Sequence, residues 1–203
     1  MYLSKLYVNI ADRKIVYHLD DADFWHKKIM DGFLDNLEPC SDARKKLGIL
    51  FRKEESDKGI IIYVQSLIAP NWYGKSWVKN AEVKDIDNII DSFRVGKFIN
   101  FNLLCTPYYT DEETKKIKCF SRKEDKINWL REKEDYNGFK LHICENVYCK
   151  QVLRNIGGNK NVSLYLTNLQ GVIEITDVDK FVEFYKEGVG RQKSYGAGML
   201  MLY

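Results

Sequence analysis

The chain has 203 residues, of which 45% are hydrophobic, 13% aromatic and 30% charged, and its formal net charge is +3. This composition is typical of a globular protein and excludes a disordered or fibrous one. The length suits one large domain or two small ones. The mild positive charge is compatible with a nucleic-acid partner but does not by itself indicate one.

The chain carries no membrane or export signal, so the sequence predicts a cytoplasmic protein. No run approaches the roughly 18 consecutive apolar residues of a membrane helix, and the opening MYLSKLYVNIADRK lacks the layout of a signal peptide. The five cysteines are odd in number and include no C-x-x-C pair, which indicates neither a disulfide framework nor a zinc site. We therefore expect reduced cysteines, no metal and no cofactor.

The first half of the chain begins with a strand, a helix and a hairpin. Alternating residues predict a strand over 2–9, and apolar residues at helical spacing predict a helix over 23–37. The polar turn ESDKG joins two further strands, over 47–52 and 60–66. The stretch 68–96 is broken by proline and glycine and fits either a short helix or an irregular strand, and we place a linker at its end.

The second half follows the order β-α-β-β-α-β. A strand with one apolar face is expected over 99–105. The spacing S-x-x-E at Ser121 and Glu124 predicts a capping box and a helix to about residue 134. The remaining predicted elements are two strands, a helix and a last strand, over 139–147, 162–175, 177–185 and 199–202.

This order indicates the fold. The arrangement β-α-β-β-α-β is that of a ferredoxin-like domain, and the first half begins with the same β-α-β-β. The sequence therefore predicts an α+β protein with two tandem ferredoxin-like (RRM-like) domains, over 1–94 and 95–203.

A glycine-dense segment, GVGRQKSYGAGML over 188–200, lies between the last helix and the last strand. It does not match the Rossmann spacing G-x-G-x-x-G or the Walker spacing G-x-x-x-x-G-K, and a Rossmann turn runs from strand to helix. Glycines beside Arg191 and Lys193 allow close approach to a phosphodiester backbone. A tight connection that needs positive φ angles explains the same glycines, and local features leave both interpretations open.

Several segments resemble the CasE type of CRISPR-associated repeat-processing endoribonucleases, which is found in Cascade complexes. The ending G-V-G-x-x-K-S-x-G-x-G-M-L is similar to that family's C-terminal glycine-rich loop, and the opening MYLSKL is similar to its first strand. The segment over 127–130 resembles its I-x-W-L helix, and QGVIEI over 170–175 resembles its E-G-x-L-x-I strand. The segment 101–107 takes the place of the family's F-R-L-R-A-N-P, so the resemblance reaches both ends and most of the second half.

The resemblance implies two ferredoxin-like domains, binding of a CRISPR repeat hairpin and cleavage at the base of its stem to give mature guide RNA. In that chemistry a ribose 2′-hydroxyl attacks the neighbouring phosphate, leaving a cyclic phosphate and a free 5′-hydroxyl. No metal is required. The resemblance also implies other Cascade subunits as partners.

Such cleavage needs a group that moves protons near neutral pH, for which histidine is suited. The candidates are His18, His26 and His142, and His26 falls where the resembled family carries a catalytic histidine in a Y-x-x-H pattern. Asp23 stands at the tyrosine position, so the second catalytic group is open: Tyr17 is one candidate, and Asp23 is another if it orients the imidazole. A nearby acid would raise the pKa of His26 and favour an imidazolium that acts as a general acid. A structural role beside the apolar helix face is the alternative for His26.

A structured RNA is gripped mainly through phosphates, 2′-hydroxyls and shape, which calls for basic residues and exposed amides. Each candidate taken alone is also explained as an ordinary solvated surface group. The family's arginine-bearing strand end appears here as Asn102, Leu104 and Cys105, so some of its RNA contacts are missing or moved. The alternative function is a non-catalytic RNA-binding subunit with the same fold. The candidate RNA-binding residues are Lys27, Lys28, Lys150, Arg154, Lys160, Gly190, Arg191, Lys193 and Ser194.

Overall fold

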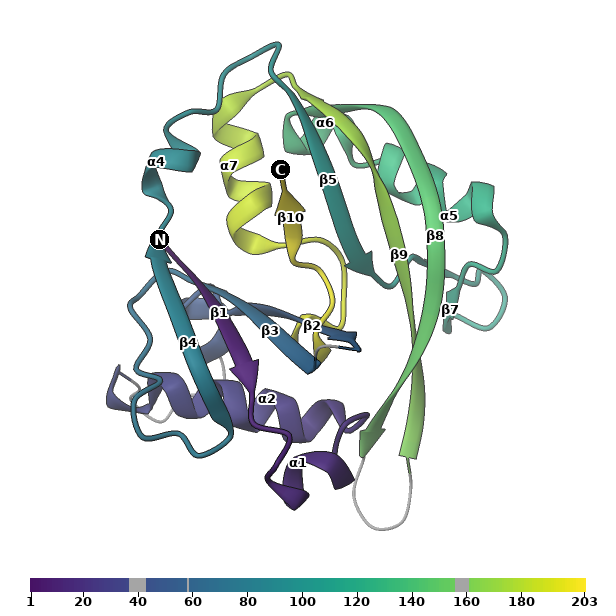
Figure 1. Cartoon of the computed structure of the whole chain (residues 1–203). Helices are drawn as coiled ribbons and strands as arrows, with labels where there is room; N and C mark the ends of the chain where they lie inside the picture. The colour runs from purple at the N-terminus through teal and green to yellow at the C-terminus, as the bar shows by residue number, and fades with distance from the viewer. Residues whose placement is uncertain (37–42, 58, 156–160) are drawn as a thin grey trace. The chain divides into compact units, whose positions relative to one another are not determined.

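A computed structural model describes residues 1–36, 43–57, 59–155 and 161–203 of the chain (Figure 1). The described residues form two compact units, each containing a four-stranded sheet. Unit 1 comprises Met1–Asp91, Val152–Leu164 and Lys193–Gly196, and unit 2 comprises Ser92–Gln151, Tyr165–Gln192 and Ala197–Tyr203. None of the helices in the described residues is both long and apolar enough to cross a membrane.

Unit 1 is built on an antiparallel sheet in the order β2-β3-β1-β4. The central strand β1 pairs with β3 and β4, so that Leu6 lies opposite Ile62 on one side and Ala81 on the other. The strands are β1 (Tyr2–Val8), β2 (Leu50–Ser56), β3 (Gly59–Ser66) and β4 (Val78–Asp85), and the helical segments are α1 (Arg13–Tyr17), α2 (Ala22–Met30), η1 (Asp31–Asn36), α3 (Ala43–Lys46) and α4 (Asp87–Ile90).

The core of unit 1 forms where α2 meets one face of this sheet. Alternate residues of the strands, Leu6 and Ile62 among them, are fully buried together with Trp25 and Ile29 of α2. Two tryptophans from the irregular segment between β3 and β4 complete the core, and the Trp72 indole N–H donates a 3.0 Å hydrogen bond to the Ser4 hydroxyl. This segment thus occupies part of the space that a second helix would fill in a ferredoxin-like domain.

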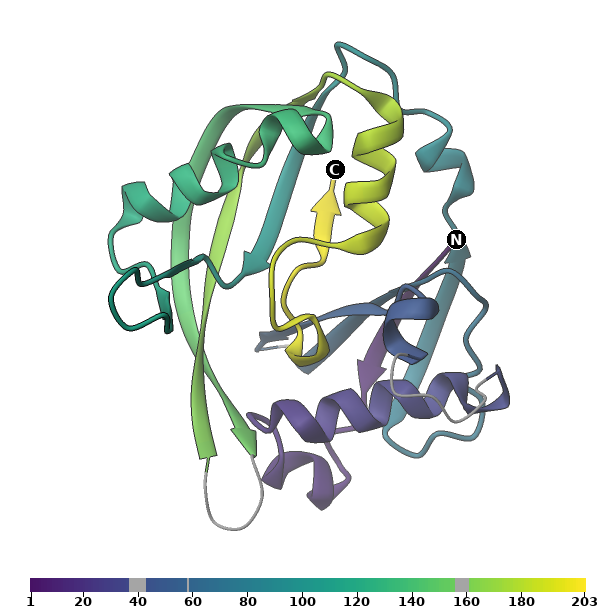
Figure 2. The ribbon, with the colours of Figure 1, turned by 180° about the vertical axis from the view of Figure 1, so that it is seen from behind.

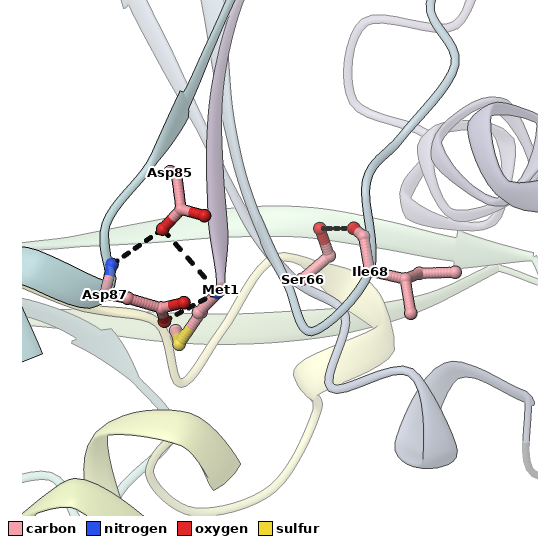
Figure 3. Close-up of polar contacts among 5 residues, drawn as sticks. All are labelled: Met1, Ser66, Ile68, Asp85 and Asp87. Carbon is pink, nitrogen blue, oxygen red and sulfur yellow. Dashed lines mark hydrogen bonds and ion pairs between the residues drawn. The ribbon is translucent and has the colours of Figure 1, made fainter.

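Polar contacts fix the ends of the strands in unit 1 (Figure 3). The Met1 ammonium lies 2.7 Å from the Asp87 carboxylate and 3.9 Å from that of Asp85, whose side chain also accepts a 2.8 Å hydrogen bond from the Asp87 amide. Beyond the end of β3, the Ser66 hydroxyl donates to the Ile68 carbonyl at 2.8 Å. These contacts tie the start of β1 to the end of β4.

Unit 2 is built on a sheet in the order β10-β5-β9-β8, and its helices cover one face, as Figures 1 and 2 show from opposite sides. The Phe139 ring of the sheet stacks on Phe184 of α7 with centroids 5.0 Å apart, and Trp129 of α5 is buried. The elements are β5 (Phe98–Cys105), β6 (Tyr108–Thr110), β7 (Ile117–Cys119), α5 (Lys123–Arg131), α6 (Glu134–Asn137), β8 (Phe139–Asn155), β9 (Asn161–Ile175), α7 (Val178–Glu187) and β10 (Leu200–Leu202), with the short helix η2 (Lys193–Tyr195) assigned to unit 1.

The predicted α+β class with two ferredoxin-like sheets is confirmed. In each sheet the strands lie side by side in the order second, third, first and fourth along the chain, which is the ferredoxin-like order.

The predicted capping box is wrong. Helix α5 begins one residue later, with Arg122 at the N-cap and no side-chain hydrogen bond to the cap. The helix predicted over 23–37 turns into a 3₁₀ helix at Asp31. Helix α1 and the β6–β7 hairpin were not predicted, and β8 runs on to Asn155.

Candidate active site

His26 is positioned by helix α2 of unit 1. The helix starts at Asp21, whose side chain accepts a 3.0 Å hydrogen bond from the Phe24 amide and so caps one of its free N–H groups. Ala22, Trp25 and Ile29 form the buried face of α2 at i, i+3 and i+7. His26 is the residue after Trp25, so its ring lies beside the core and is half-buried rather than sealed inside it.

The surroundings of His26 lower the pKa of its imidazole. Partial burial is the largest cause, and the positive charge of Arg44 lowers the pKa further, with a smaller contribution from Lys27. Asp23 acts in the opposite direction but does not outweigh the others. Asp23 thus raises the pKa of His26 as expected, but the net shift is downward, which favours the neutral ring over the expected imidazolium.

Asp23 carries an unusual carboxylate oxygen. Its Oδ2 atom is buried and has no hydrogen-bond partner among the residues that the structure describes. A buried oxygen of this kind is costly unless a donor reaches it, so Asp23 is suited to accept a hydrogen bond from a bound molecule. Tyr17, the other candidate for catalytic support, ends α1 with 84% of its surface exposed, and the described part of the chain shows no contact between it and His26.

Arg44 is the site residue that sequence reasoning missed. It lies in α3, is about half-buried, and holds the Ile49 carbonyl with a 2.8 Å hydrogen bond from Nη1. Its charge is the largest electrostatic influence on His26. The run Arg44-Lys45-Lys46 was the available signal, but nothing in the local pattern places that run near α2.

The glycine-rich segment contributes to unit 1 through η2, which contains Lys193 and Ser194 and contacts both α2 and β2. Gly196 follows it with φ at +86°, and a Cβ atom there would lie 3.1 Å from the Phe51 ring. The turn interpretation of the glycines is thus supported at this position. The structure also brings two of the predicted RNA-binding residues to the helix that carries His26.

The other RNA-binding candidates are more scattered. Lys27 is exposed on α2, and the Lys28 ammonium lies 5.6 Å from the Phe24 ring centroid. In unit 2, the Arg191 guanidinium lies 5.4 Å from the Tyr108 ring centroid. Gly190 has φ at +76°, and a Cβ atom there would lie 3.0 Å from the Trp129 side chain. Lys150 and the backbone of Arg154 belong to β8. Lys160 lies outside the described residues.

The two other histidines have partners of their own. His18 pairs with Asp21 at 3.2 Å and stacks on Phe24 with centroids 4.7 Å apart. His142 pairs with Glu174 at 2.7 Å in unit 2. Both of these histidines thus pair with a carboxylate, whereas His26 has the basic side chains of Arg44 and Lys27 among its electrostatic neighbours. The same ranges contain no cluster of three or more histidine, cysteine or acidic side chains able to hold a metal ion.

The comparison with protein families identifies this architecture. The family model described as CRISPR associated protein matches residues 1–203, the whole chain. The chain belongs to this family. Within it, the chain is 23% identical over 214 residues to the CRISPR-associated endoribonuclease Cse3 of Thermus thermophilus, with 98% of each protein covered.

Solved structures of CRISPR-associated proteins share the fold. Cse3 from Thermus thermophilus, bound to an RNA representing a pre-cleavage complex, superposes with a TM-score of 0.80 at 19% identity, over 100% of this chain and 98% of that one. Cas6e from Escherichia coli K-12 superposes with a TM-score of 0.71 at 20% identity, over 100% and 98%. The fold of this family member is therefore that of Cse3 and Cas6e.

Proposed function

We propose that the chain is a metal-independent endoribonuclease that cleaves CRISPR repeat hairpins in precursor RNA by attack of a 2′-hydroxyl, giving mature guide RNA. The name of the Thermus thermophilus relative and the full-length family match support the reaction class. The further proposal is that cleavage leaves a 2′,3′-cyclic phosphate, that other Cascade subunits are partners, and that the protein acts in the cytoplasm. The N-terminal domain, 1–94, carries the catalytic histidine, and the domain over 95–203 supplies part of the RNA grip.

The observation that carries the proposal is the half-buried His26 with its lowered pKa. A neutral imidazole has a free lone pair, so His26 removes the proton from the 2′-hydroxyl as a general base. The oxygen then attacks the adjacent phosphate, and the bond to the 5′-oxygen breaks. In this scheme the imidazolium formed in the first step is the source of the proton that the leaving oxygen needs.

The charges around His26 fit the second requirement of this reaction. Negative charge grows on the phosphate as the 2′-oxygen attacks, and cationic side chains that face it lower the barrier. Arg44 is near His26, and Lys193 belongs to η2, which contacts the same helix. We assign these two residues to the phosphate, and the remaining predicted basic residues to the flanking stem.

Asp23 replaces the second catalytic group that the sequence left open. Its unpartnered Oδ2 atom is available to accept a hydrogen bond from the substrate. Its negative charge raises the pKa of His26 and so makes the imidazole a stronger base. The exposed Tyr17 is a less direct candidate, because it has no contact with this pair among the described residues. The same replacement favours the second candidate function, a non-catalytic RNA-binding subunit, if an aspartate cannot take the place of a tyrosine.

A cleavage gel separates the two functions. The protein is incubated with its cognate repeat RNA in EDTA, beside His26→Ala and the matched control His18→Ala, an exposed histidine of the same unit. We expect cleavage that survives chelation, is unchanged in the control and falls about 10²- to 10⁴-fold in His26→Ala, with RNA affinity nearly unchanged. Tight binding with no cleavage by the unaltered protein would instead establish the non-catalytic subunit.

A substrate with 2′-deoxyribose at the scissile position tests the nucleophile. Under the proposed mechanism this RNA binds but is not cut, because the attacking oxygen is missing. A product formed from it would rule out attack by the 2′-hydroxyl whatever the result with His26→Ala.

A further inference from the structure

Unit 2 contains a cysteine in a setting that the proposed RNA chemistry does not use. Cys149 lies in β8, and its sulfur is 3.2 Å from the Lys126 ammonium of α5 and 3.5 Å from the Thr167 hydroxyl of β9. The Cys149 side chain is solvent-exposed, so small molecules reach it. Three elements thus place a nucleophilic atom between two hydrogen-bonding groups at the surface of the unit.

The Lys126 side chain is the decisive part of this arrangement. Its residue is only 8% exposed, and Cys149 is its one hydrogen-bond partner within the described ranges, where no carboxylate pairs with it. A buried ammonium without a counter-charge is costly, and an anion beside it removes much of that cost. A thiolate at Cys149 provides such an anion, so the lysine stabilises the reactive form of the cysteine.

We propose that Cys149 is a thiol-modification site, at which the Lys126-paired sulfur attacks small disulfides and becomes a mixed disulfide. The Cys149 thiolate forms a bond to one sulfur of the incoming disulfide, whose sulfur–sulfur bond breaks, and the second half leaves as a thiolate. Electrons balance because one disulfide is consumed and one is formed. The required oxidant is the small disulfide itself.

The other described cysteines provide the contrast. Burial raises the pKa of the Cys149 thiol, but hydrogen bonds from Thr167 and Lys126 and the lysine charge outweigh it, so the net shift is downward. Burial raises the pKa of Cys119 and Cys105, and it raises that of Cys144 to about 11. Cys119 is also exposed and the charge of Lys126 lowers its pKa as well, but it has no hydrogen bond to Lys126 among the described residues, which makes it the comparison for that hydrogen bond.

The test uses the full chain and the aromatic disulfide 4,4′-dithiodipyridine at neutral pH, with the modified cysteine identified by peptide mapping. We expect Cys149 to react about tenfold faster than Cys119, because a larger fraction of it is thiolate. Lys126→Met should slow Cys149 by about tenfold, Lys126→Arg should restore most of the rate, and Cys119→Ser should leave it unchanged. Equal rates at the two cysteines, or no effect of Lys126→Met, would overturn the proposal.

A measurement on the unaltered protein covers the case in which Lys126→Met does not fold, as judged by circular dichroism. The rate of labelling at each cysteine is followed from pH 6 to 10. The midpoint for Cys149 should lie below that for Cys119, and a midpoint at or above it overturns the proposal. This result is independent of the ribonuclease assignment, since neither cysteine belongs to the unit that carries His26.

Discussion

Units 1 and 2 arrange their sheet strands in the same order but cover the sheets differently. In unit 2, the helices α5 and α7 both follow the ferredoxin-like plan, and Phe181 and Phe184 of α7 are buried. In unit 1, α1, α2, η1 and α3 precede the hairpin, and an irregular segment with Trp72 and Trp77 stands where the second crossover helix is expected.

The first crossover helix of each unit carries polar residues in partly or fully buried positions, and one residue from each helix shows how their surroundings differ. In α2 it is His26, which is half-buried beside Arg44 and loses its proton readily. In α5 it is Lys126, which is buried against a cysteine. Corresponding helices of the two units thus hold the proposed proton acceptor in one case and a buried positive charge in the other, and the neighbouring side chains decide which chemistry results.

The largest expected effect tests whether the irregular segment of unit 1 packs as firmly as a helix of unit 2. Trp72→Ala should lower the free energy of unfolding by about 3–5 kcal/mol, as large as the effect of Phe181→Ala in α7, because each removes a buried aromatic ring. Urea unfolding measures both. Tyr73→Ala is the control next in sequence, since Tyr73 is 94% exposed and should change stability by less than about 0.5 kcal/mol. A Trp72→Ala effect below about 1 kcal/mol would show that the segment is not part of the core.

A smaller effect concerns the glycine-rich segment in unit 1. Gly196→Ala forces a side chain into the left-handed region, at a cost of about 1–2 kcal/mol, and also presses on Phe51. Gly74→Ala shares the positive φ, +73°, but has open space around its Cβ position. Thermal unfolding should therefore show Gly196→Ala to be the less stable of the two variants. Equal stabilities would mean that Phe51 yields without cost.

The smallest effect is a shift in the pH profile of cleavage, and its direction follows from the neighbours of His26. Under the proposed mechanism the neutral ring is the active form, so activity is present above the pKa of His26 and is lost as the pH falls through it. Because that pKa is lowered, the acid limb should lie below the ordinary value of about 6.5.

Two variants should move this limb in opposite directions. Arg44→Gln removes a charge that lowers the pKa and shifts the limb upward, whereas Asp23→Asn removes one that raises it and shifts the limb downward. A shift of one pH unit changes the rate about tenfold at a fixed pH on the limb. Single-turnover cleavage from pH 4.5 to 8 measures both midpoints, and shifts in the same direction would contradict the assignment of His26 as the base.

The accuracy of the sequence predictions differed between the two units for physical reasons. Periodic segments such as 99–105 and the helix capped by Asp177 were located well, because local hydrophobic alternation and a capping side chain determine them. The interval 68–96 was left open, and the structure resolves it into an irregular segment, β4 and α4. Its strand β4 pairs with β1 across 70 residues at Val8 and Val78 and 83 residues at Tyr2 and Asp85, a contact that no local pattern encodes.

The sequence by itself determined the α+β class and the order of the elements in the second half, because these depend on periodicity and on short segments whose residues lie next to one another in the chain. The choice of His26 came from the resemblance to the family and stays a prediction. Only the tertiary structure decided the direction in which the pKa of His26 is shifted. Arg44 is eighteen positions away along the chain and lowers the pKa of the imidazole only because the chain brings α3 near α2. Burial and the approach of distant charges set a pKa, and both are properties of the folded chain rather than of any one segment.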